Sequence, residues 1–398
     1  SMLNGKKIIL AVSGSIAAYK SALIIRLLIK AGASVKVIMT EASEDFITPL
    51  TLSTLSKNPV FKDFTKDDDS GEWNNHVELG LWADAIIVAP ATANTIAKMV
   101  SGHADSLLLA VYLSARCSVF VAPAMDLDMY QHESTQENLK TLIERGNLII
   151  QPESGELASG LIGEGRLTEP DHILEFLNKY FAEKASLYGL KLMVSAGPTH
   201  EPIDPVRFIG NHSSGKMGFA LAEEAAKRGA DVTLIAGPVS LETPYGVNRI
   251  NVKTAQDMFD ACIGIFDKQD IIIMAAAVAD YAPIEVASEK VKKKTEDWNI
   301  ELKKTKDVLA WIGENKKVNQ KLIGFALETE NEQANAVGKL ERKNLDIIVL
   351  NSLKDEGAGF QHDSNKVTII DRNNKVISFE LKSKHEVAID ILDAIENY

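Results

Sequence analysis

The sequence is poor in cysteine, with Cys117 and Cys262 as its only two cysteines, one in each half of the 398 residues. Both lie among apolar neighbours, so no disulfide framework is expected. This scarcity of cysteine is typical of proteins in a reducing compartment. The sequence also lacks an apolar run of about 18 residues, which argues against a membrane-spanning helix. Its first residues lack the charged and then apolar pattern of a signal peptide, and Ser1-Met2 resembles a cloning remnant. We therefore expect a cytoplasmic protein that does not enter a membrane.

Positive charge is also scarce. Lys and Arg number 43 against 55 Asp and Glu, which gives a formal net charge of −12. Nucleic-acid phosphates require clustered Lys and Arg, so no nucleic-acid partner is expected. The hydrophobic fraction of 45% and the charged fraction of 25% are those of an ordinary globular protein. At 398 residues the chain exceeds what one hydrophobic core usually serves, so two domains are predicted.

The first half alternates buried-type strands with helices. Strands are predicted at residues 7–12, 34–39, 85–89, 119–122 and 148–150, and helices at 16–31 and 171–181. This pattern predicts a parallel sheet that binds ligands at the carboxyl ends of its strands. The loop Ser13-Gly14-Ser15 lacks the three spaced glycines of a dinucleotide site and suits a single phosphate better. Residues 62–75 and 156–166 are expected to be mobile loops, and 183–189 a linker.

The second half repeats this plan. Residues 227–235 echo residues 30–38, since each stretch is a helix end followed by a strand. Further strands are predicted at 191–196, 271–275, 322–326 and 345–350, a hairpin at 366–371 and 375–381, and a last helix at 384–396. Residues 288–306 are rich in lysine and without periodicity, which predicts a loop. The fold class is therefore α/β, with two Rossmann-like parallel-sheet domains.

One mid-chain stretch, residues 193–218, combines a strand, a Gly-Pro turn, a long polar loop and a helix that begins near Gly215. Asn211, Ser213 and Ser214 can cap that helix, whose first N–H groups lie at its positive end. Lys216 adds a positive charge, so the stretch predicts a site for phosphate or carboxylate. The plainer interpretation is a long, well-capped loop between a strand and a helix.

Several polar residues follow predicted strands and could carry chemistry. His76 lies between a polar stretch and a strand, where it could be structural or a general base. Asp126 and Asp128 could be ligands or helix caps. Asp280 follows a strand and, with Lys290, Lys339 and Lys343, suggests a polyphosphate or metal–nucleotide site; a solvated lysine face is the alternative. Lys339 and Lys343 lie four residues apart, as on one helix face.

Read together, these motifs closely resemble the bifunctional coenzyme A biosynthesis proteins of bacteria. The most specific stretches are Gly14-Ser-Ile-Ala-Ala-Tyr-Lys20, His76-Val-Glu-Leu-Gly80, Ala89-Pro-Ala-Thr-Ala93, Ala196-Gly-Pro-Thr199, Asn211-His-Ser-Ser-Gly-Lys-Met-Gly218 and Ala276-Ala-Val-Ala-Asp-Tyr281. The resemblance covers essentially the whole chain. It implies a flavodoxin-like, FMN-dependent phosphopantothenoylcysteine decarboxylase at residues 1–185. It also implies a phosphopantothenate–cysteine ligase with a C-terminal β-hairpin at residues 190–398.

In the decarboxylase half, the resemblance implies that FMN is held by one group of loop residues: Ser13, Gly14, Ser15, Ile16, Thr40, Thr92, Ala93 and Asn94. His76 would be the base that helps to oxidise the substrate's cysteinyl thiol. Met125 and Asp126 would contact the substrate, and Ser159 would stand where the family places its proton donor. The family also suggests decarboxylase trimers grouped into a dodecamer.

This half departs from the family pattern at two positions. The family's Pro-x-Met-Asn motif, whose Asn grips the substrate carboxylate, ends here in Asp126. An ionised Asp126 would repel that carboxylate. The family's proton-donating cysteine is replaced by Ser159, whose hydroxyl is far less acidic than a thiol. Both changes bear on the decarboxylase rate more than on the flavin-binding fold.

In the ligase half, the resemblance implies that CTP and Mg²⁺ bind at a second group: Asp280, Lys290, Lys306, Asp307, Val308, Leu309, Phe325, Lys339 and Lys343. The carboxylate of 4′-phosphopantothenate would form an acyl-cytidylate, and the amine of L-cysteine would then displace CMP. Lys290 and Asn211 would be catalytic, with Asn211 supporting the second step. The protein ligands of the metal are not indicated, and ligase dimers are expected.

Two other functions compete with the bifunctional enzyme. The first is an active ligase whose flavin-binding domain is weakly active or regulatory. The second, a nicotinamide-dependent dehydrogenase, is excluded because the glycine fingerprint is missing.

Overall fold

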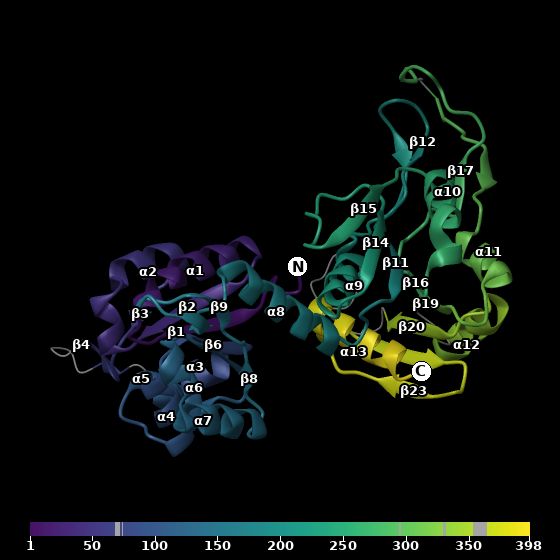
Figure 1. Cartoon of the computed structure of the whole chain (residues 1–398). Coiled ribbons are helices and arrows are strands. Elements are labelled where there is room, and N and C mark those ends of the chain that lie inside the picture. The colour runs from purple at the N-terminus through teal and green to yellow at the C-terminus, as the bar shows by residue number, and fades with distance from the viewer. Residues whose placement is uncertain (68–71, 74, 294–295, 329–331, 353–363) are drawn as a thin grey trace. The chain divides into compact units, whose positions relative to one another are not determined.

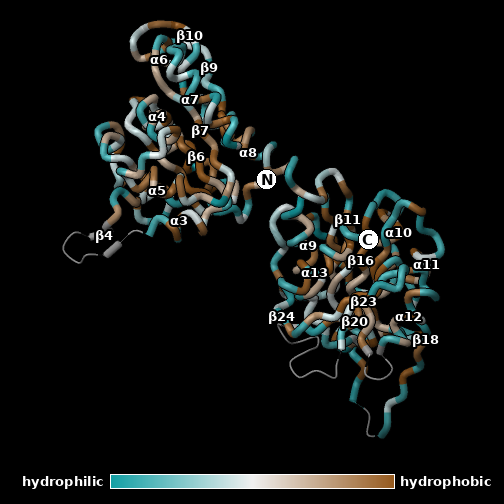
Figure 2. Tube along the Cα trace, turned by 90° about the horizontal axis from the view of Figure 1, so that it is seen from below, coloured by the Kyte–Doolittle hydropathy of each residue, from teal (hydrophilic) through white to brown (hydrophobic). Residues whose placement is uncertain are grey.

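A computed structural model describes residues 1–67, 72–73, 75–293, 296–328, 332–352 and 364–398. The chain forms two compact units, Ser1–Lys184 and Ala185–Tyr398. Each unit encloses its own core, and Figure 2 shows the hydrophobic residues gathered along the central strands of each.

The first unit is built on a parallel sheet of six strands in the order β3-β2-β1-β6-β7-β8. The strands are β1 (Lys7–Val12), β2 (Ser34–Met39), β3 (Val60–Phe61), β6 (Ala85–Ala91), β7 (Ser118–Pro123) and β8 (Leu148–Ile149). Every residue of β6 is buried, as expected for an apolar strand covered on both faces. The five strands predicted in this half are confirmed, with small differences at their ends.

Helices cover both faces of this sheet (Figure 1). One face packs against α1 (Lys20–Lys30), α2 (Pro49–Ser56) and α8 (Pro170–Lys184). The other packs against α3 (His76–Trp82), α4 (Ala93–Ser101), α5 (Leu107–Ser114) and α7 (Glu133–Glu144). The predicted helix 16–31 begins as the 3₁₀ turn η1 (Ile16–Tyr19) and continues as α1.

The two stretches of this unit that were predicted to be mobile loops contain strands instead. Residues 156–166 belong largely to an antiparallel hairpin of β9 (Glu153–Glu156) and β10 (Ile162–Arg166). Residues 62–75 contain the pair β4 (Thr65–Asp67) and β5 (Glu72–Trp73), and the rest of that prediction falls partly outside the described residues. Glycine and polar residues suggest mobility, but the ladder of an antiparallel pair is made by backbone N–H and C=O groups, which these residues also carry.

The second unit has an eight-stranded sheet in the order β15-β14-β11-β16-β19-β20-β22-β23. Six strands run parallel: β11 (Lys191–Ala196), β14 (Asp231–Ala236), β15 (Val247–Asn251), β16 (Ile271–Met274), β19 (Lys321–Glu328) and β20 (Ile347–Ser352). The antiparallel hairpin of β22 (Val367–Asp371) and β23 (Val376–Ser378) completes the sheet, which confirms the predicted C-terminal hairpin. The predicted α/β fold class is confirmed in both units.

Helices α9 (Lys216–Lys227) and α13 (Lys384–Glu396) cover one face of this sheet. Helices α10 (Ala255–Ile265), α11 (Val308–Asn315) and α12 (Glu332–Arg342) cover the other. The predicted last helix, 384–396, is confirmed.

Short strand pairs extend from the second unit. β12 (Glu201–Pro202) pairs with β13 (Phe208–Ile209), and β17 (Tyr281–Pro283) pairs with β18 (Leu302–Lys304). The predicted loop 288–306 is therefore partly a strand. Figure 1 shows the β12 turn and the segment after β17 projecting from the same end of the unit. There the Ala287 N–H donates to the carbonyl of Ile203 at 3.0 Å, which joins the two projections.

Candidate functional sites

Two loops meet at the carboxyl ends of β1 and β6 in the first unit. The chain leaves β1 toward β2 on one side and enters β6 on the other, and this reversal of strand order is where parallel α/β sheets bind ligands. Ser13 joins the loops, because its Oγ donates to the carbonyl of Pro90 at 2.5 Å and accepts from the Thr92 N–H at 3.0 Å. Ser13 is buried, and its hydroxyl ties the two loops together.

The other residues predicted for the cofactor lie close to this junction. Thr92 caps α4 by accepting from the Thr95 N–H at 3.2 Å, which leaves Ala93 and Asn94 in the first turn of the helix. Thr40 caps the 3₁₀ turn η2 (Glu41–Asp45) that follows β2. The N–H groups at the start of α4 favour an anion.

A cleft of about 540 Å³ opens beside these loops. It is lined by the start of η1, the loop after β7 and the β9–β10 hairpin. Ser15 and Ile16, both predicted for the cofactor, belong to its wall. Ile16 is 61% exposed, so its apolar side chain is available to cover a planar ring. The N-terminus of α4 suits a phosphate group and the apolar wall suits a flat ring, so together they fit a flavin mononucleotide.

The hairpin is seated on the loop after β7 by close backbone contact. Gly165 has φ +137°, and a Cβ atom there would lie 2.3 Å from the carbonyl oxygen of Met125, so only glycine fits. The Met125 N–H donates to the carbonyl of Gly165 at 2.9 Å. These contacts fix the turn of the hairpin, and with it Ser159, over Asp126.

Asp126 and Ser159 form a hydrogen-bonded pair in this cleft. The Ser159 hydroxyl donates to Oδ1 of Asp126 at 2.6 Å, and the same oxygen accepts from the Leu127 N–H at 2.9 Å. Asp126 is the N-cap of the short helix α6 (Leu127–Gln131), so the cap interpretation holds together with a place in the cleft. Asp128 lies exposed in the first turn of α6. The two departures from the family pattern are thus in direct contact.

His76 does not line this cleft as the described residues form it. It is the first residue of α3, which Asn75 caps, and it is half-buried. Its ring meets Phe64 edge to face, with 6.2 Å between the ring centres. The role of His76 as a base stays a prediction.

Sequence reasoning missed Lys20 as a wall residue of the same cleft. Its ammonium is buried and donates to Glu169 Oε1 at 3.0 Å and to the carbonyl of Leu167 at 3.4 Å. The hydrogen bond from Lys20 is the main cause that lowers the pKa of Glu169 below its ordinary value. Lys20 is a lysine on the buried face of an apolar helix, and that is the signal that could have marked it.

The second unit carries two clefts that share a wall. One, of about 490 Å³, we call the nucleotide cleft, and the other, of about 340 Å³, the α9 cleft. The nucleotide cleft is lined by every residue predicted for CTP except Lys290. Asp280, Phe325 and Lys339 line both clefts, so a ligand in one lies beside a ligand in the other.

Ion pairs and caps shape the nucleotide cleft. Asp307 caps α11 by accepting from the Ala310 N–H at 3.0 Å, and its other oxygen pairs with the Lys343 ammonium. Partial burial raises the pKa of Asp307, but the hydrogen bonds from Lys343 and Ala310 outweigh it, so the pKa lies below its ordinary value. Lys339 donates to the carbonyl of Phe325 at 2.6 Å. Helix α12 ends at Arg342, but the Lys343 N–H still donates to the carbonyl of Lys339 at 2.9 Å, and both lysines line the nucleotide cleft, as the one-face prediction requires.

Lys290 lies outside both clefts as the described residues form them. It is exposed on the segment after β17. The next residue, Val291, is anchored, because its N–H donates to Asp204 at 3.0 Å and its carbonyl accepts from Arg207 at 3.1 Å. The catalytic and CTP-binding roles of Lys290 stay predictions.

The α9 cleft is built around the start of α9, from Ser213 to Gly218. Gly215, with φ +78°, is the N-cap residue and offers no side chain, so none of the predicted caps Asn211, Ser213 and Ser214 stands at the N-cap position itself. The Ser214 side chain nevertheless accepts from the helix, from the Lys216 N–H at 3.3 Å. A Cβ atom on Gly218 would lie 2.3 Å from Cβ of Ala196, so this glycine lets α9 approach β11 closely.

Asn211 joins the two sides of this cleft. Its Nδ2 donates to the carbonyl of Ala277 at 2.6 Å, and its Oδ1 accepts from the Ser213 N–H at 3.0 Å. The loop before α9 is therefore held against the loop after β16. A role for Asn211 in the second half-reaction remains a prediction, and the structure gives it a positioning contact.

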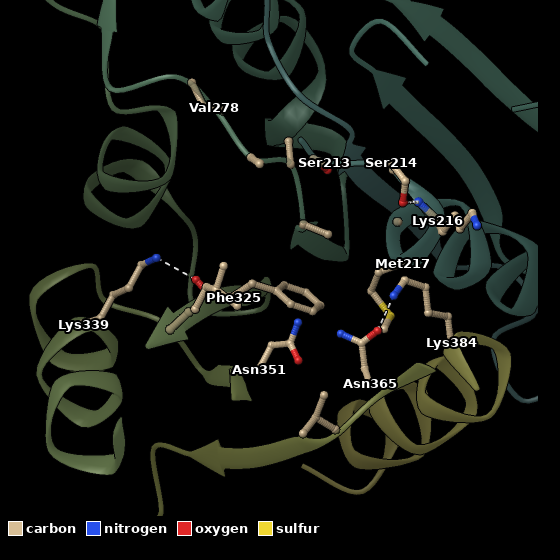
Figure 3. A pocket seen from close by; sticks show the side chains of 18 of the residues that line it. Ser213, Ser214, Lys216, Met217, Val278, Phe325, Lys339, Asn351, Asn365 and Lys384 are labelled. Carbon is tan, nitrogen blue, oxygen red and sulfur yellow. Dashed lines mark hydrogen bonds between the residues drawn. The ribbon is translucent and has the colours of Figure 1, made fainter. Parts of the chain in front are cut away.

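Sequence reasoning also missed a polar cluster in the α9 cleft, formed by Asn351, Asn365 and Lys384 (Figure 3). Asn365 and Lys384 are 3% and 7% exposed, and the Lys384 ammonium donates to Asn365 Oδ1. Oδ1 of Asn351 is buried and has no hydrogen-bond partner among the described residues. The three residues come from β20, β21 (Ser364–Asn365) and α13, so no local sequence signal unites them.

Neither a clustered metal site nor a membrane-spanning helix occurs in the part of the chain that the structure describes. No group of three or more His, Cys, Asp or Glu side chains there could hold a metal ion. Within the same residues, no helix has both the length and the apolar character needed to cross a membrane.

Comparison with known proteins assigns each of the two units to a protein family. Residues 1–182 match the family described as Flavoprotein, and residues 187–398 match the DNA/pantothenate metabolism flavoprotein C-terminal domain. The chain is 48% identical over 398 residues to the coenzyme A biosynthesis bifunctional protein CoaBC of Haemophilus influenzae, covering 100% of this chain and 98% of that protein. The chain belongs to the family of bifunctional coenzyme A biosynthesis proteins. The resemblance drawn from the motifs is confirmed.

Two further similarities complete the comparison. A cysteine/cysteine sulfinic acid decarboxylase from an unknown prokaryotic organism is 55% identical over 354 residues, or 88% of this chain and 98% of that protein. The crystal structure of the C-terminal domain of a CoaBC protein is 42% identical and covers 53% of this chain and 96% of its own, with a TM-score of 0.47.

Proposed function

We propose that this member of the bifunctional family catalyses two consecutive steps of coenzyme A biosynthesis. Residues 190–398 join L-cysteine to 4′-phosphopantothenate with CTP, and residues 1–185 decarboxylate the product to 4′-phosphopantetheine. The observation that carries the ligase assignment is the nucleotide cleft, where residues predicted for CTP from separate elements line one cavity. That cavity shares Asp280 and Lys339 with a cleft that begins at a helix N-terminus.

Charge in the two clefts suits reactions on phosphates. Lys306, Lys339 and Lys343 line the nucleotide cleft and neutralise the charge that builds up on a triphosphate. Mg²⁺ in such sites is held by one or two carboxylates and by substrate phosphates, and the exposed carboxylate of Asp280 on the shared wall fits that role. When bound, Mg²⁺ would screen charge on the leaving pyrophosphate.

The ligation proceeds in two displacements. A carboxylate oxygen of 4′-phosphopantothenate attacks the α-phosphorus of CTP, and the bond to pyrophosphate breaks. The amine of cysteine then attacks the acyl carbon, the bond to the CMP oxygen breaks, and the amine proton passes to solvent. Asn211 fixes the loop before α9 against Ala277 and so keeps the two reacting groups in place.

We propose that the first unit holds FMN with the loops at the carboxyl ends of its strands β1, β2 and β6. Thr92, Ala93 and Asn94 at the start of α4 would receive the phosphate, Ser15 and Ile16 would border the ring, and Ser13, Gly14 and Thr40 shape the loops. When bound, FMN supplies hydride acceptance from the carbon that bears the substrate thiol. We assign His76 as the base for that thiol, supplied where copies of the chain associate, since the family suggests trimers within a dodecamer.

Ser159 and Asp126 stand in for the family's thiol and amide. Because the Ser159 hydroxyl donates to Asp126, its own proton points at the carboxylate. A protonated Asp126 could reverse this bond and pass a proton through Ser159 to the substrate carbon. An ionised Asp126 would instead hold the serine proton and repel the substrate carboxylate.

The Asp126 carboxylate also favours a second candidate for the first unit. A carboxylate attracts an ammonium group, so the cleft could accept a free amino acid such as cysteine in place of an acylated one. The name of the relative that is 55% identical agrees with this candidate. We place either activity in the cytoplasm, because both cysteines are free thiols and Cys262 is fully buried.

The proposal is tested by following each unit separately in the purified protein. Pyrophosphate release from CTP and 4′-phosphopantothenate reports the ligase, and bound FMN is read from the visible absorption spectrum. Supplying 4′-phosphopantothenoylcysteine and, in a separate assay, free cysteine to the FMN-loaded protein distinguishes the two decarboxylase candidates. Turnover of neither substrate would overturn the decarboxylase assignment.

A further inference from the structure

The polar cluster of Asn351, Asn365 and Lys384 has no part in the roles assigned so far. It lines the α9 cleft, on the far side from the loop that precedes α9 (Figure 3). Asn365 and Lys384 are buried, although the cleft itself is open to a ligand. Buried polar groups are normally satisfied by hydrogen bonds within the protein, so an unsatisfied one requires a reason.

Asn351 carries such an unsatisfied buried polar group. Its Oδ1 is buried without a hydrogen-bond partner in the part of the chain that the structure describes. An unpaired buried acceptor is costly to the fold unless something with an N–H or O–H group binds to it. The position therefore suits a ligand that donates a hydrogen bond.

Lys384 and Asn365 differ from Asn351, because they offer hydrogen-bond donors and a positive charge. Lys384 is the first residue of α13, where the helix dipole favours a negative group, and its ammonium adds a full positive charge. The ammonium donates to Asn365 Oδ1, which orients the Asn365 amide so that its N–H₂ group lies on the other side. An ammonium and an amide N–H₂ together suit a carboxylate.

A ligand that donates at one end and carries a carboxylate at the other is an α-amino acid. The remaining wall near Lys384 is apolar, with Met217 and Val367, and would receive a small thiol-bearing side chain. The shared residues Asp280 and Lys339 place this pocket next to the nucleotide cleft, where the acyl group is activated.

We propose that Asn351, Asn365 and Lys384 form the subsite for the amino-acid substrate of the ligase. Lys384 and Asn365 hold the carboxylate of cysteine, and Asn351 accepts from its amine. This inference rests on the proposed ligase function and adds to it the position of the third substrate.

The test uses the full chain and two readouts. Pyrophosphate release from CTP and 4′-phosphopantothenate without cysteine reports activation, and cysteine-dependent CMP release reports the second step. Asn351→Leu removes the acceptor at similar volume, and Lys384→Met removes the charge but keeps the apolar stem. Lys382→Met is the matched control, because that ammonium pairs with Asp390 at 2.8 Å outside the cleft.

We expect both cleft variants to release pyrophosphate at a rate within about twofold of that of the unaltered chain. Their KM for cysteine should rise at least about tenfold, because each variant loses a hydrogen bond to a charged group of the substrate. Cysteamine, which lacks the carboxylate, should be a poor substrate for the unaltered chain, and Lys384→Met should remove most of that discrimination. The melting temperature of Asn351→Leu should not fall, because the replaced oxygen has no partner to lose.

An unchanged KM for cysteine in both variants would overturn the proposal. Equal loss of pyrophosphate release and CMP release in folded variants would also overturn it, since the cluster would then serve the nucleotide or 4′-phosphopantothenate. Absence of pyrophosphate release from the unaltered chain would instead refute the ligase function itself.

Discussion

Replacement of Asp126 by Asn separates the charge of this residue from its geometry. In the structure, Oδ1 accepts from the Ser159 hydroxyl at 2.6 Å and from the Leu127 N–H at 2.9 Å. An asparagine Oδ1 can accept both bonds, so the cap of α6 and the seat of the hairpin should persist. Only the negative charge is lost.

The magnitude follows from the place of Asp126 in an open cleft. Two carboxylates about 4 Å apart repel by about 1 kcal/mol in water and by about 4 kcal/mol at an effective dielectric constant of about 20. Asp126 is only half-buried, so the lower part of this range applies, about 1–2 kcal/mol. For an acylated cysteine bearing a free carboxylate, Asp126→Asn should therefore lower the KM by roughly 5- to 30-fold.

The assay measures kcat and KM for decarboxylation of 4′-phosphopantothenoylcysteine and of free cysteine. Asp128→Asn is the matched control, since it removes one charge from the same short helix at an exposed position. In Asp126→Asn, but not in Asp128→Asn, the KM for the acylated substrate should fall and the KM for free cysteine should rise. Unchanged KM values for both substrates would refute the reasoning that this charge faces the substrate.

Three further predictions concern other residues. Asn211→Asp turns an amide donor into an oxygen that faces the Ala277 carbonyl at 2.6 Å, which should cost about 2–3 kcal/mol; mass spectrometry should then show acyl-cytidylate accumulating, and efficient product formation would contradict this. Burial raises the pKa of the Cys262 thiol to about 12, so iodoacetamide at about pH 8 should leave it unmodified in the native protein, and rapid labelling would be inconsistent with the fold. Burial would raise the pKa of Asp204, but hydrogen bonds from Val291, Val206 and Arg207 hold it well below its ordinary value. That stabilisation is complete above the ordinary aspartate pKa and is lost as pH falls through the lower folded pKa. Asp204→Asn should therefore speed hydrogen exchange around Val291 at neutral pH, with the difference shrinking in strong acid, and equal exchange at neutral pH would oppose this.

The sequence was sufficient to predict the strands that position both sites. Apolar runs such as residues 7–12 and 191–196 can only be buried, and their alternation with helices leaves a parallel sheet as the natural solution. Parallel α/β sheets bind ligands at the carboxyl ends of their strands, so the loops there were candidate ligand contacts from the strand pattern alone. The nucleotide cleft follows from the same logic combined with the family resemblance.

The hairpin over Asp126 could not be predicted in this way. Glycines in residues 156–166 suggest mobility, whereas Gly165 in fact permits a close backbone contact with Met125. Whether a glycine loosens a loop or lets two segments touch depends on what lies opposite, and local sequence does not contain that information. The Ser159–Asp126 contact depends on that tertiary approach.

The Asn351–Asn365–Lys384 cluster shows the same limit at longer range. Lys384 at the start of a helix resembles an ordinary solvated lysine, and the two asparagines lie at strand ends. Their meeting depends on the antiparallel return of β22 beside β20 and on the packing of α13 against the sheet. Likewise, nothing in the sequence shows that His76 lies outside the cleft that the described residues of the first unit form.

The central claim, that one chain carries both activities, is tested most directly by a single incubation. Purified protein loaded with FMN receives 4′-phosphopantothenate, cysteine, CTP and Mg²⁺, and the products are identified by mass spectrometry. The account predicts 4′-phosphopantetheine, with 4′-phosphopantothenoylcysteine as a transient species. Accumulation of 4′-phosphopantothenoylcysteine alone would contradict the decarboxylase half, and absence of both products would contradict the account as a whole.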